Sequence, residues 1–266
     1  MSPVQLSVGD TFIPPVATAW DEIDGDITHL IDYDDGGIDT NLAGTYEVSW
    51  TVTNSRDKYT IVTLEVIVSP QNSNEYTGYY QSLSGLSGSA LDIALANLIY
   101  NTGSSTGTTA QVQTVDYYNG QNYNIYTGFG AYGNREHVWP ASLLGSGNPQ
   151  DDLHNLRAAV MTVNSTRANY PFTNAISQLS WQLVNGNTFY PGSEHVGDVA
   201  RIVLYMSIRN GISLNLVGNL QMFLDWHLED PVSDFEISRN NKIYNIQNNR
   251  NPFIDHPELV YEYFIN

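Results

Sequence analysis

The stretch Asn-Arg-Glu-His-Val-Trp-Pro, residues 134–140, decides the fold of the larger part of this 266-residue chain. Its Glu136 and His137 are adjacent, and adjacent residues on a strand point to opposite faces. Their side chains therefore cannot meet at one point without a bend or help from elsewhere. Two segments follow within thirty residues, Asp-Asp-Leu-His-Asn-Leu-Arg (151–157) and Met-Thr-Val-Asn-Ser-Thr-Arg (161–167). We expect them to complete a site beside His137.

A second Glu-His-Val copy starts at Glu194 and has a different setting. Ser193 precedes it and predicts a helix N-cap, with the helix running to about Asn210 and stopped by Gly211. A carboxylate in the first turn complements the helix dipole, whereas a protonated imidazole there is disfavoured. We interpret His195 as a neutral, structural histidine near solvent, and contact with a substrate is the weaker alternative.

Composition limits the kind of protein and the kind of site. The chain is 41% hydrophobic, which suits a globular fold, and no apolar run reaches the length of a membrane helix. The N-terminus lacks the basic and apolar pattern of a signal peptide. There is no cysteine, so disulfides and thiolate metal sites are excluded and metal ligands must be His, Asp, Glu or Asn.

Charge is unevenly distributed along the chain. The formal net charge is -18, which argues at first against a polyanionic partner. Residues 1–69 hold twelve acidic and two basic residues, while residues 70–266 hold sixteen acidic and eight basic ones. Seven of those eight bases are arginines, which can bind a phosphate through two hydrogen bonds. The acidity therefore does not exclude a nucleic-acid substrate for the second part.

Residues 1–69 alternate as strands do. Tyr46, Val48, Trp50 and Val52 fall on one face of a strand, and residues 62–68 repeat the pattern. This predicts an all-β sandwich. The phrases Trp-Asp-Glu-Ile-Asp-Gly-Asp-Ile-Thr and Ile-Asp-Thr-Asn-Leu-Ala-Gly-Thr-Tyr-Glu-Val-Ser-Trp-Thr-Val-Thr-Asn resemble bacterial immunoglobulin-like modules of secreted and surface proteins.

The aspartates of this part could be read as a calcium site. Ile23 and Gly25 break the ligand order of an EF-hand, so we favour solvated turns. The four aspartates concerned are Asp21, Asp24, Asp26 and Asp32.

A polar linker is expected at residues 70–76, and a second, α+β domain over residues 77–266. Its expected helices start at Ser89, at Leu216 and at Asp230-Pro231, ending near Tyr100, Leu228 and Asn248 respectively. Asn-Gly pairs at 119–120 and 185–186 lie between strand-like runs and predict hairpins.

Several ordered motifs of this second domain resemble the bacterial endonuclease I family over about residues 77–260. They are R-E-H-V-x-P, D-L-H-N-L, V-N-x-x-R-x-N, G-D-V-A-R-I-V-L-Y-M, W-H-L-E-D-P-V-S-D-F-E-x-x-R and N-R-N-P-F-I-D. That family belongs to the ββα-metal, or His-Me finger, nucleases. The resemblance implies two strands and a helix that present a histidine and a divalent metal to one phosphodiester.

The resemblance assigns roles to particular residues. It implies that His137 is the general base and that Glu136 and Asn164 hold the metal. The 27 positions from His137 to Asn164 leave room for a strand end, a loop, a return strand and the first helical turn. Arg167, three residues after Asn164, is expected to face the same phosphate. Two oxygen ligands leave most positions to water, which suits Mg2+, with Mn2+ or Ca2+ as substitutes.

Other polar residues of the motifs are candidates for supporting roles or substrate contact. His154 and Asn155 are expected to hold the loop and orient His137, with direct metal contact as the weaker alternative. Relatives carry a long basic insertion after R-E-H, including an arginine on the product phosphate, but here that insertion is short. Possible replacements for this arginine, each otherwise an ion-pair partner, are Arg157, Arg167, Arg201, Arg239 and Arg250. Arg135 of R-E-H is a further substrate or supporting candidate.

These observations predict a secreted or cell-surface, magnesium-dependent, sequence-nonspecific endonuclease that acts on DNA, and on RNA as a second substrate. As in the family, it should leave 5'-phosphate ends. We expect a monomer whose first domain contacts a cell surface or matrix, and, with few bases, a shallow dependence on salt. The alternatives are a surface adhesion protein with an inert nuclease-like half and, less favoured, a glycosidase, for which no carboxylate pair can be singled out.

Overall fold

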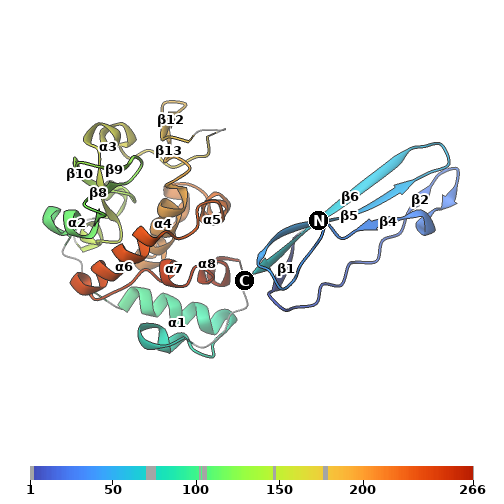
Figure 1. The fold of residues 1–266 in the computed structure, drawn as a ribbon, viewed down its shortest axis with the longest axis horizontal. Coiled ribbons are helices and arrows are strands. Elements are labelled where there is room, and N and C mark those ends of the chain that lie inside the picture. The colour runs from blue at the N-terminus through green and yellow to red at the C-terminus, as the bar shows by residue number, and fades with distance from the viewer. Residues whose placement is uncertain are drawn as a thin grey trace. The chain divides into compact units, whose positions relative to one another are not determined.

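The computed structural model describes residues 3–69, 76–101, 103, 107–145, 148–175 and 179–265. The chain forms two compact units, Met1–Glu75 and Tyr76–Asn266 (Figure 1). Apart from Tyr76, the linker expected over residues 70–76 lies outside the described residues. Within the described ranges, no helix has both the length and the hydrophobicity needed to cross a membrane.

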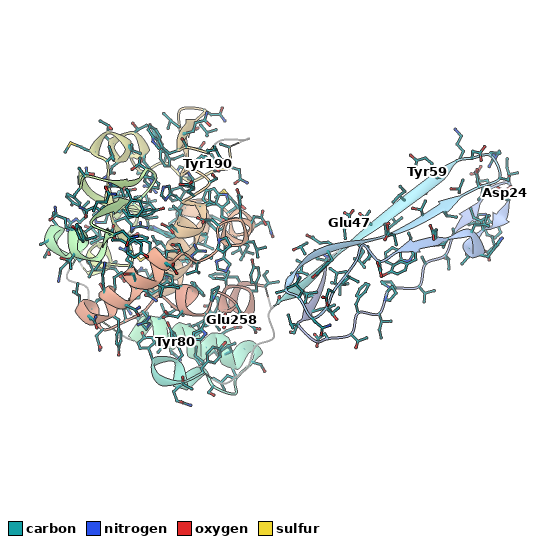
Figure 2. The ribbon with its side chains drawn as sticks, viewed as in Figure 1. Asp24, Glu47, Tyr59, Tyr80, Tyr190 and Glu258 are labelled. Atoms are coloured by element: carbon teal, nitrogen blue, oxygen red, sulfur yellow. The ribbon has the colours of Figure 1, made fainter. Side chains whose placement is uncertain are left out.

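The first unit is built around one four-stranded sheet in the order β1-β6-β5-β4. β1 runs parallel to β6, and the other neighbours are antiparallel. The long β5 and β6 form a hairpin, along which Glu47 and Tyr59 are exposed (Figure 2). The elements are β1 (Val4–Ser7), β2 (Trp20–Asp21), β3 (Gly25–Asp26), η1 (Thr28–Leu30), β4 (Asp32–Asp34), β5 (Gly44–Thr53) and β6 (Tyr59–Ser69).

The expected alternation produces the core of this unit. Val48 and Trp50 of β5 pack with Leu64 and Val66 of β6, and all four are buried. The expected second sheet differs, because in the described residues only the short β2–β3 pair accompanies the main sheet. Side chains from segments without regular secondary structure cover the core face instead, among them Phe12, Ala17, Ile31 and Ile38.

Two of the aspartates considered for calcium hold the tip of the β5–β6 hairpin. Asp21 accepts hydrogen bonds from Asn54 and Arg56, and Asp24 accepts two from Ser55. The Asn54 amide and nearby backbone N–H groups lower the pKa of Asp21 to about 2. These carboxylates therefore act as turn residues.

The second unit mixes helices with short strand pairs. Its elements are η2 (Gly78–Leu83), α1 (Gly88–Asn101), α2 (Thr109–Val115), β7 (Tyr117–Tyr118), β8 (Gln121–Asn124), β9 (Gly128–Gly130), β10 (Asn134–His137), η3 (Ala141–Leu143), η4 (Asn148–Asp151), β11 (Leu156–Ala159), α3 (Met161–Arg167), β12 (Gln182–Val184), β13 (Thr188–Tyr190), α4 (Val196–Asn210), η5 (Leu214–Leu216), α5 (Leu220–Glu229), α6 (Asp234–Gln247), α7 (Pro252–Asp255) and α8 (Leu259–Phe264). The α+β class is as expected.

The central helix is α4, which is buried from Val196 to Ser207 and packs against α1, α5 and α7 (Figure 1). It ends as predicted, because Gly211 adopts a left-handed conformation (φ 62°). The prediction of its start was wrong by two residues. The N-cap position is taken by His195, not Ser193.

Two other helix starts also differ from expectation because stronger caps lie downstream. Asn219 caps α5 through Met222 N–H, so the segment at Leu216 is only a 3-10 turn. Ser233 and Glu236 form a capping box that starts α6 after Asp230-Pro231. Both Asn-Gly hairpins are confirmed, with positive φ at Asn119-Gly120 and at Asn185-Gly186.

Candidate functional site

His137 ends strand β10, which pairs antiparallel with β11 so that His137 lies opposite Leu156. Its ring Nε2 is 2.9 Å from the carbonyl oxygen of Gln150. Because a carbonyl only accepts, Nε2 carries the proton and the lone pair of the neutral ring is on Nδ1. Burial lowers the pKa of half-buried His137 below its usual value. The ring is therefore neutral at pH 7 and can accept a proton at Nδ1.

The chain just after His137 is held by Asn155. The Asn155 side chain accepts from Trp139 N–H (2.6 Å) and donates to Trp139 carbonyl (3.0 Å). The Asn155 backbone carbonyl also accepts from Val138 N–H. The Asn155 side chain thus fixes Trp139, two residues after the end of β10, and so helps to keep the His137 backbone in place.

His154 lies in the turn before β11, and its side chain points to a different neighbour. It is buried with its ring 4.7 Å from that of Tyr205. Burial lowers the pKa of His154 to about 4, so it is neutral. Its observed contact is with helix α4, which supports a packing role for His154.

Glu136 points to the interior, on the face of β10 opposite His137. Its Oε1 accepts a hydrogen bond from the Tyr126 hydroxyl (2.9 Å) and lies 3.5 Å from Arg167 Nε. Burial raises the pKa of Glu136 from 4.5 to about 7, and Arg167, Tyr126 and His137 N–H oppose that rise. This carboxylate would be stabilised in its ionised form by a further cation.

Tyr126 was not singled out from the sequence. It is buried in the second unit and is one of the few non-glycine residues with a left-handed backbone (φ 74°). Burial first, and the Glu136 charge second, raise the pKa of Tyr126 well above 10. Its hydroxyl therefore stays protonated and remains a donor to Glu136.

Asn164 lies in helix α3, which follows β11 directly. Its Nδ2 donates to Asn134 Oδ1 (3.0 Å) and to the carbonyl of Arg135 (3.2 Å), so the helix is tied to strand β10. Because Nδ2 donates both of these hydrogen bonds, the orientation of the amide is fixed, and its Oδ1 remains available as a metal ligand or hydrogen-bond acceptor.

Glu136 and Asn164 together offer hard oxygen donors of the kind that Mg2+ prefers. The buried, partly neutralised carboxylate and the oriented Asn164 Oδ1 both fit such an ion. The described residues contain no group of three or more His, Cys, Asp or Glu side chains that could hold a metal. An ion bound here would therefore keep most of its coordination positions for water and substrate oxygens.

Arg167 is fully buried and turned toward Glu136. It donates to the carbonyls of Val138 (2.6 Å) and Ala168 (3.0 Å), and its guanidinium lies 4.7 Å from the centre of the Phe172 ring. A contact with a phosphate at the surface would break these interactions. The arrangement supports a role in holding Glu136 and the backbone next to His137.

Three of the arginines considered for the product phosphate lie in buried ion pairs. Arg157 bridges Asp116 (3.2 Å) and Asp198 (3.0 Å), and Arg239 binds Asp116 from the other side (2.5 Å). Arg201 binds both carboxylate oxygens of Glu236 (2.6 and 2.8 Å). Each is at most 3% exposed, so none can reach a phosphate without leaving its partners.

Two of the arginines predicted as site residues keep some access to solvent. Arg250 forms two hydrogen bonds with Asp255 and lies over the Tyr244 ring. Arg135 is half-buried and donates a hydrogen bond to the carbonyl of Gly107. It precedes His137 by two positions on β10, so the two side chains lie on the same face of the strand. Of the predicted arginines, Arg135 is the one on the face of His137.

His195, in the second Glu-His-Val copy, is buried rather than near solvent. Its ring lies 5.7 Å from that of Tyr123, and burial lowers its pKa to about 4. It is therefore neutral, as expected, but it packs inside the unit.

Comparison with known proteins finds a family match for each part of the chain. Residues 62–258 match the family described as Endonuclease I, and residues 1–68 match the bacterial surface protein Ig-like domain. An extracellular ribonuclease of Bacillus amyloliquefaciens is 35% identical over 75% of this chain and 82% of its own length. An extracellular ribonuclease of Bacillus subtilis is 38% identical over 48% of this chain and 53% of its own length. A periplasmic deoxyribonuclease of Aeromonas hydrophila is 31% identical over 40% of this chain and 48% of its own length.

Proposed function

Because this chain belongs to the endonuclease I family, we propose that it is an extracellular, sequence-nonspecific endonuclease that hydrolyses DNA and RNA. Relatives named as ribonucleases and as deoxyribonucleases support both substrates. The observation that carries the proposal is that a proton-accepting His137 shares strand β10 with Glu136, while Asn164 is hydrogen-bonded to the same strand.

We assign β10, β11 and α3 as a ββα-metal core. In support, β10 and β11 are antiparallel, α3 follows β11 directly, and Asn164 of α3 donates a hydrogen bond to the Arg135 carbonyl of β10. Glu136 and Asn164 would hold Mg2+, with Mn2+ or Ca2+ as substitutes. When bound, the ion supplies positive charge next to the phosphate and the leaving oxygen.

The chain's own residues prepare the attack on phosphorus. Nδ1 of His137 takes a proton from the attacking water, and the Gln150 carbonyl stabilises the imidazolium that results by accepting from Nε2. Asn155 holds the backbone that follows, which fixes the direction of the ring. Cleavage of the bond between phosphorus and the 3' oxygen leaves a 5'-phosphate.

Arg135 is the best placed arginine for a phosphate contact, because it shares the His137 face of β10 and, among the described residues, forms no ion pair with a carboxylate while donating to the Gly107 carbonyl. Arg157, Arg167, Arg201 and Arg239 act inside the fold and Arg250 is paired with Asp255, so few phosphates are neutralised. This supports binding that depends weakly on salt.

The immunoglobulin-like unit is proposed to attach the enzyme to a cell surface or matrix, and the chain to act as a monomer. An adhesion protein with an inert nuclease half is not favoured, because the second half keeps a general base and two oxygen donors on one strand and its helix.

Nicking of supercoiled plasmid tests the proposal. Wild type with Mg2+ should nick the plasmid, EDTA should abolish nicking, and His137→Ala should lower the rate about 10²- to 10⁴-fold, the range for a general base. His29→Ala removes an exposed histidine of the first unit and should act as wild type. Equal nicking by wild type and His137→Ala, or none by wild type, would overturn it.

A further inference from the structure

One edge of strand β6 has no partner over its first half. β1 pairs with β6 only from Val66 to Ser69. Within residues 3–69, nothing pairs with the stretch from Tyr59 to Thr63 on the side away from β5. An unpaired strand edge is a template for another strand.

Two hydrogen bonds show which backbone groups this edge offers. The carbonyl of Lys58 accepts from Asn54 N–H and so faces β5, whereas the carbonyl of Ser69 accepts from Val8 N–H on the opposite side. Backbone groups of successive residues alternate between the two edges of a strand. The N–H and C=O groups of Tyr59, Ile61 and Thr63 therefore point outward.

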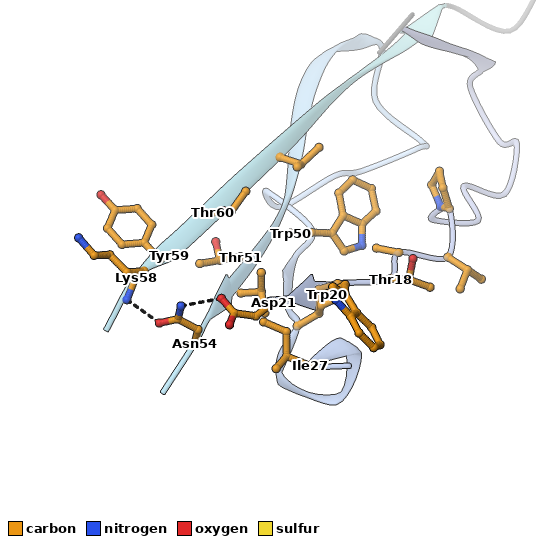
Figure 3. A pocket seen from close by; sticks show the side chains of 17 residues that line it. Thr18, Trp20, Asp21, Ile27, Trp50, Thr51, Asn54, Lys58, Tyr59 and Thr60 are labelled. Carbon is orange, nitrogen blue, oxygen red and sulfur yellow. Dashed lines mark hydrogen bonds between the residues drawn. The ribbon is translucent and has the colours of Figure 1, made fainter. Parts of the chain in front are cut away.

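A cavity of about 460 Å³ opens on the core face beside this edge (Figure 3). Val62 of β6, at 42% exposure, lines it, although Leu64 on the same face is buried at 3%. The loop side of the cavity contributes Val16 and Trp20, which are 96% and 77% exposed. The core of this unit is thus incompletely covered where the edge is free.

The other face of the sheet carries four carboxylates, although Tyr59, Ile61 and Thr63 of the free stretch also lie on it. Glu65 of β6 lies directly opposite Glu47 of β5, a destabilising pair of like charges. Asp32 and Asp34 of β4 pair with Thr51 and Ser49 and continue the same face. A basic side chain on an added strand would relieve this repulsion, whereas a second copy of this acidic unit would increase it.

We propose that the β6 edge binds an extended segment of another protein as an added strand, with side chains alternating between apolar and basic. The apolar side chains enter the cavity beside Val62, and the basic ones lie on the acidic face near Glu65. Backbone hydrogen bonds to Tyr59, Ile61 and Thr63 set the register.

A synthetic peptide of alternating lysine and valine, Lys-Val-Lys-Val-Lys-Val-Lys with blocked ends, is the probe. Binding to the full chain is measured by fluorescence anisotropy, and amide hydrogen exchange shows where it binds. Protection of Tyr59, Ile61 and Thr63 N–H groups is expected. The matching glutamate-valine peptide should not bind, since it brings negative charge to the acidic face.

Ile61→Pro removes the outward N–H without touching the β5–β6 ladder, and proline is tolerated at a strand edge. Ile61→Pro should weaken peptide binding about tenfold or more, because one hydrogen bond is lost and the proline ring blocks the approach of the added strand. Ile61→Thr keeps the N–H and should change the affinity for the peptide little. Val62→Lys, which places a charge at the cavity mouth, is a second blocking variant and should weaken binding as well.

Full-strength binding to both blocking variants, or protection outside β6, would overturn the proposal. A concentration-dependent dimer of the free chain that Ile61→Pro abolishes would also overturn it, because the occupant would then be a second copy. Plasmid nicking should stay at the wild-type rate in every variant, which separates this test from that of the nuclease function.

Discussion

Replacing Tyr126 by phenylalanine removes one hydroxyl and tests how the site controls Glu136. The hydroxyl donates to Glu136 Oε1 at 2.9 Å inside the protein, where burial raises the pKa of Glu136 to about 7. A hydrogen bond to a charged group contributes about 1.5–3 kcal/mol. Its loss favours the neutral carboxyl and should move the acid limb of the pH–rate profile upward by about one to two pH units.

The size of the effect at a fixed pH follows directly. If about half of Glu136 is ionised at pH 7 in wild type, a shift of one to two pH units leaves roughly 10% to 1% ionised. Nicking at pH 7 should fall about 5- to 50-fold and recover as the pH approaches 9. The ring of phenylalanine keeps the packing, and the left-handed backbone at this position is unchanged.

The assay is the initial rate of plasmid nicking from pH 5 to 9.5 at subsaturating Mg2+, with thermal unfolding as a check on the fold. Tyr117→Phe is the matched control, because its hydroxyl donates only to the carbonyl of Gly120 in an exposed turn. A Tyr126→Phe enzyme with an unchanged melting temperature and the wild-type acid limb would refute the reasoning.

Asn164→Ala should lose about 10- to 100-fold in apparent affinity for Mg2+ in titrations of nicking rate, whereas a vertical drop in rate at unchanged Mg2+ affinity would count against a ligand role. Arg167→Met leaves Glu136 without its buried partner and should cost about 3–5 kcal/mol, or roughly 10 °C in melting temperature, while Arg56→Met at the exposed Asp21 pair should leave the melting temperature nearly unchanged. If Arg167 contacts phosphate instead, activity would fall without a change in melting temperature. The pKa of Glu136 is raised in the folded protein, so the free energy of unfolding is highest below pH 4.5, the ordinary pKa of the group. It should fall by about 3 kcal/mol as the pH rises through about 7, when EDTA keeps the site free of metal. Glu136→Gln should lack this loss in melting curves at pH 4.5 and 8, and identical pH dependence in the two proteins would contradict the assignment. With about two phosphates neutralised, nicking should fall only about tenfold between 50 and 200 mM salt, and a fall of 10³ or more would mean that further basic groups bind the backbone.

Local signals predicted the parts of the fold that depend on a few adjacent residues. The end of α4 at Gly211 and the hairpin at Asn119-Gly120 follow from the left-handed conformation that these residues adopt at little cost. The start of α6 was missed because two N-terminal signals compete. The capping box at Ser233 determines the first turn, and Asp230 instead accepts hydrogen bonds through its backbone and side chain.

The sequence motifs identified Glu136, His137 and Asn164 as candidates, and the structure places the first two on β10 and the third on α3, which is hydrogen-bonded to β10. The motifs do not indicate which arginines are buried. Arg157 and Arg239 find Asp116 at separations of 41 and 123 residues, and no periodicity reports a contact of that range. Tyr126 was missed for the same reason, since its role depends on packing against Glu136 rather than on a pattern around it.

The ion pairs that join Asp116, Arg157, Asp198 and Arg239 unite four elements from α2 to α6. During synthesis, the first three of these charged groups are made before Arg239, so one carboxylate lacks a counter-charge until α6 emerges. Burying an unbalanced charge costs several kcal/mol, which opposes early compaction of the nascent unit. We therefore expect the unit to complete its folding only once α6 is available, and a chain cut between Asp198 and Arg239 to be digested faster by a protease than the intact unit.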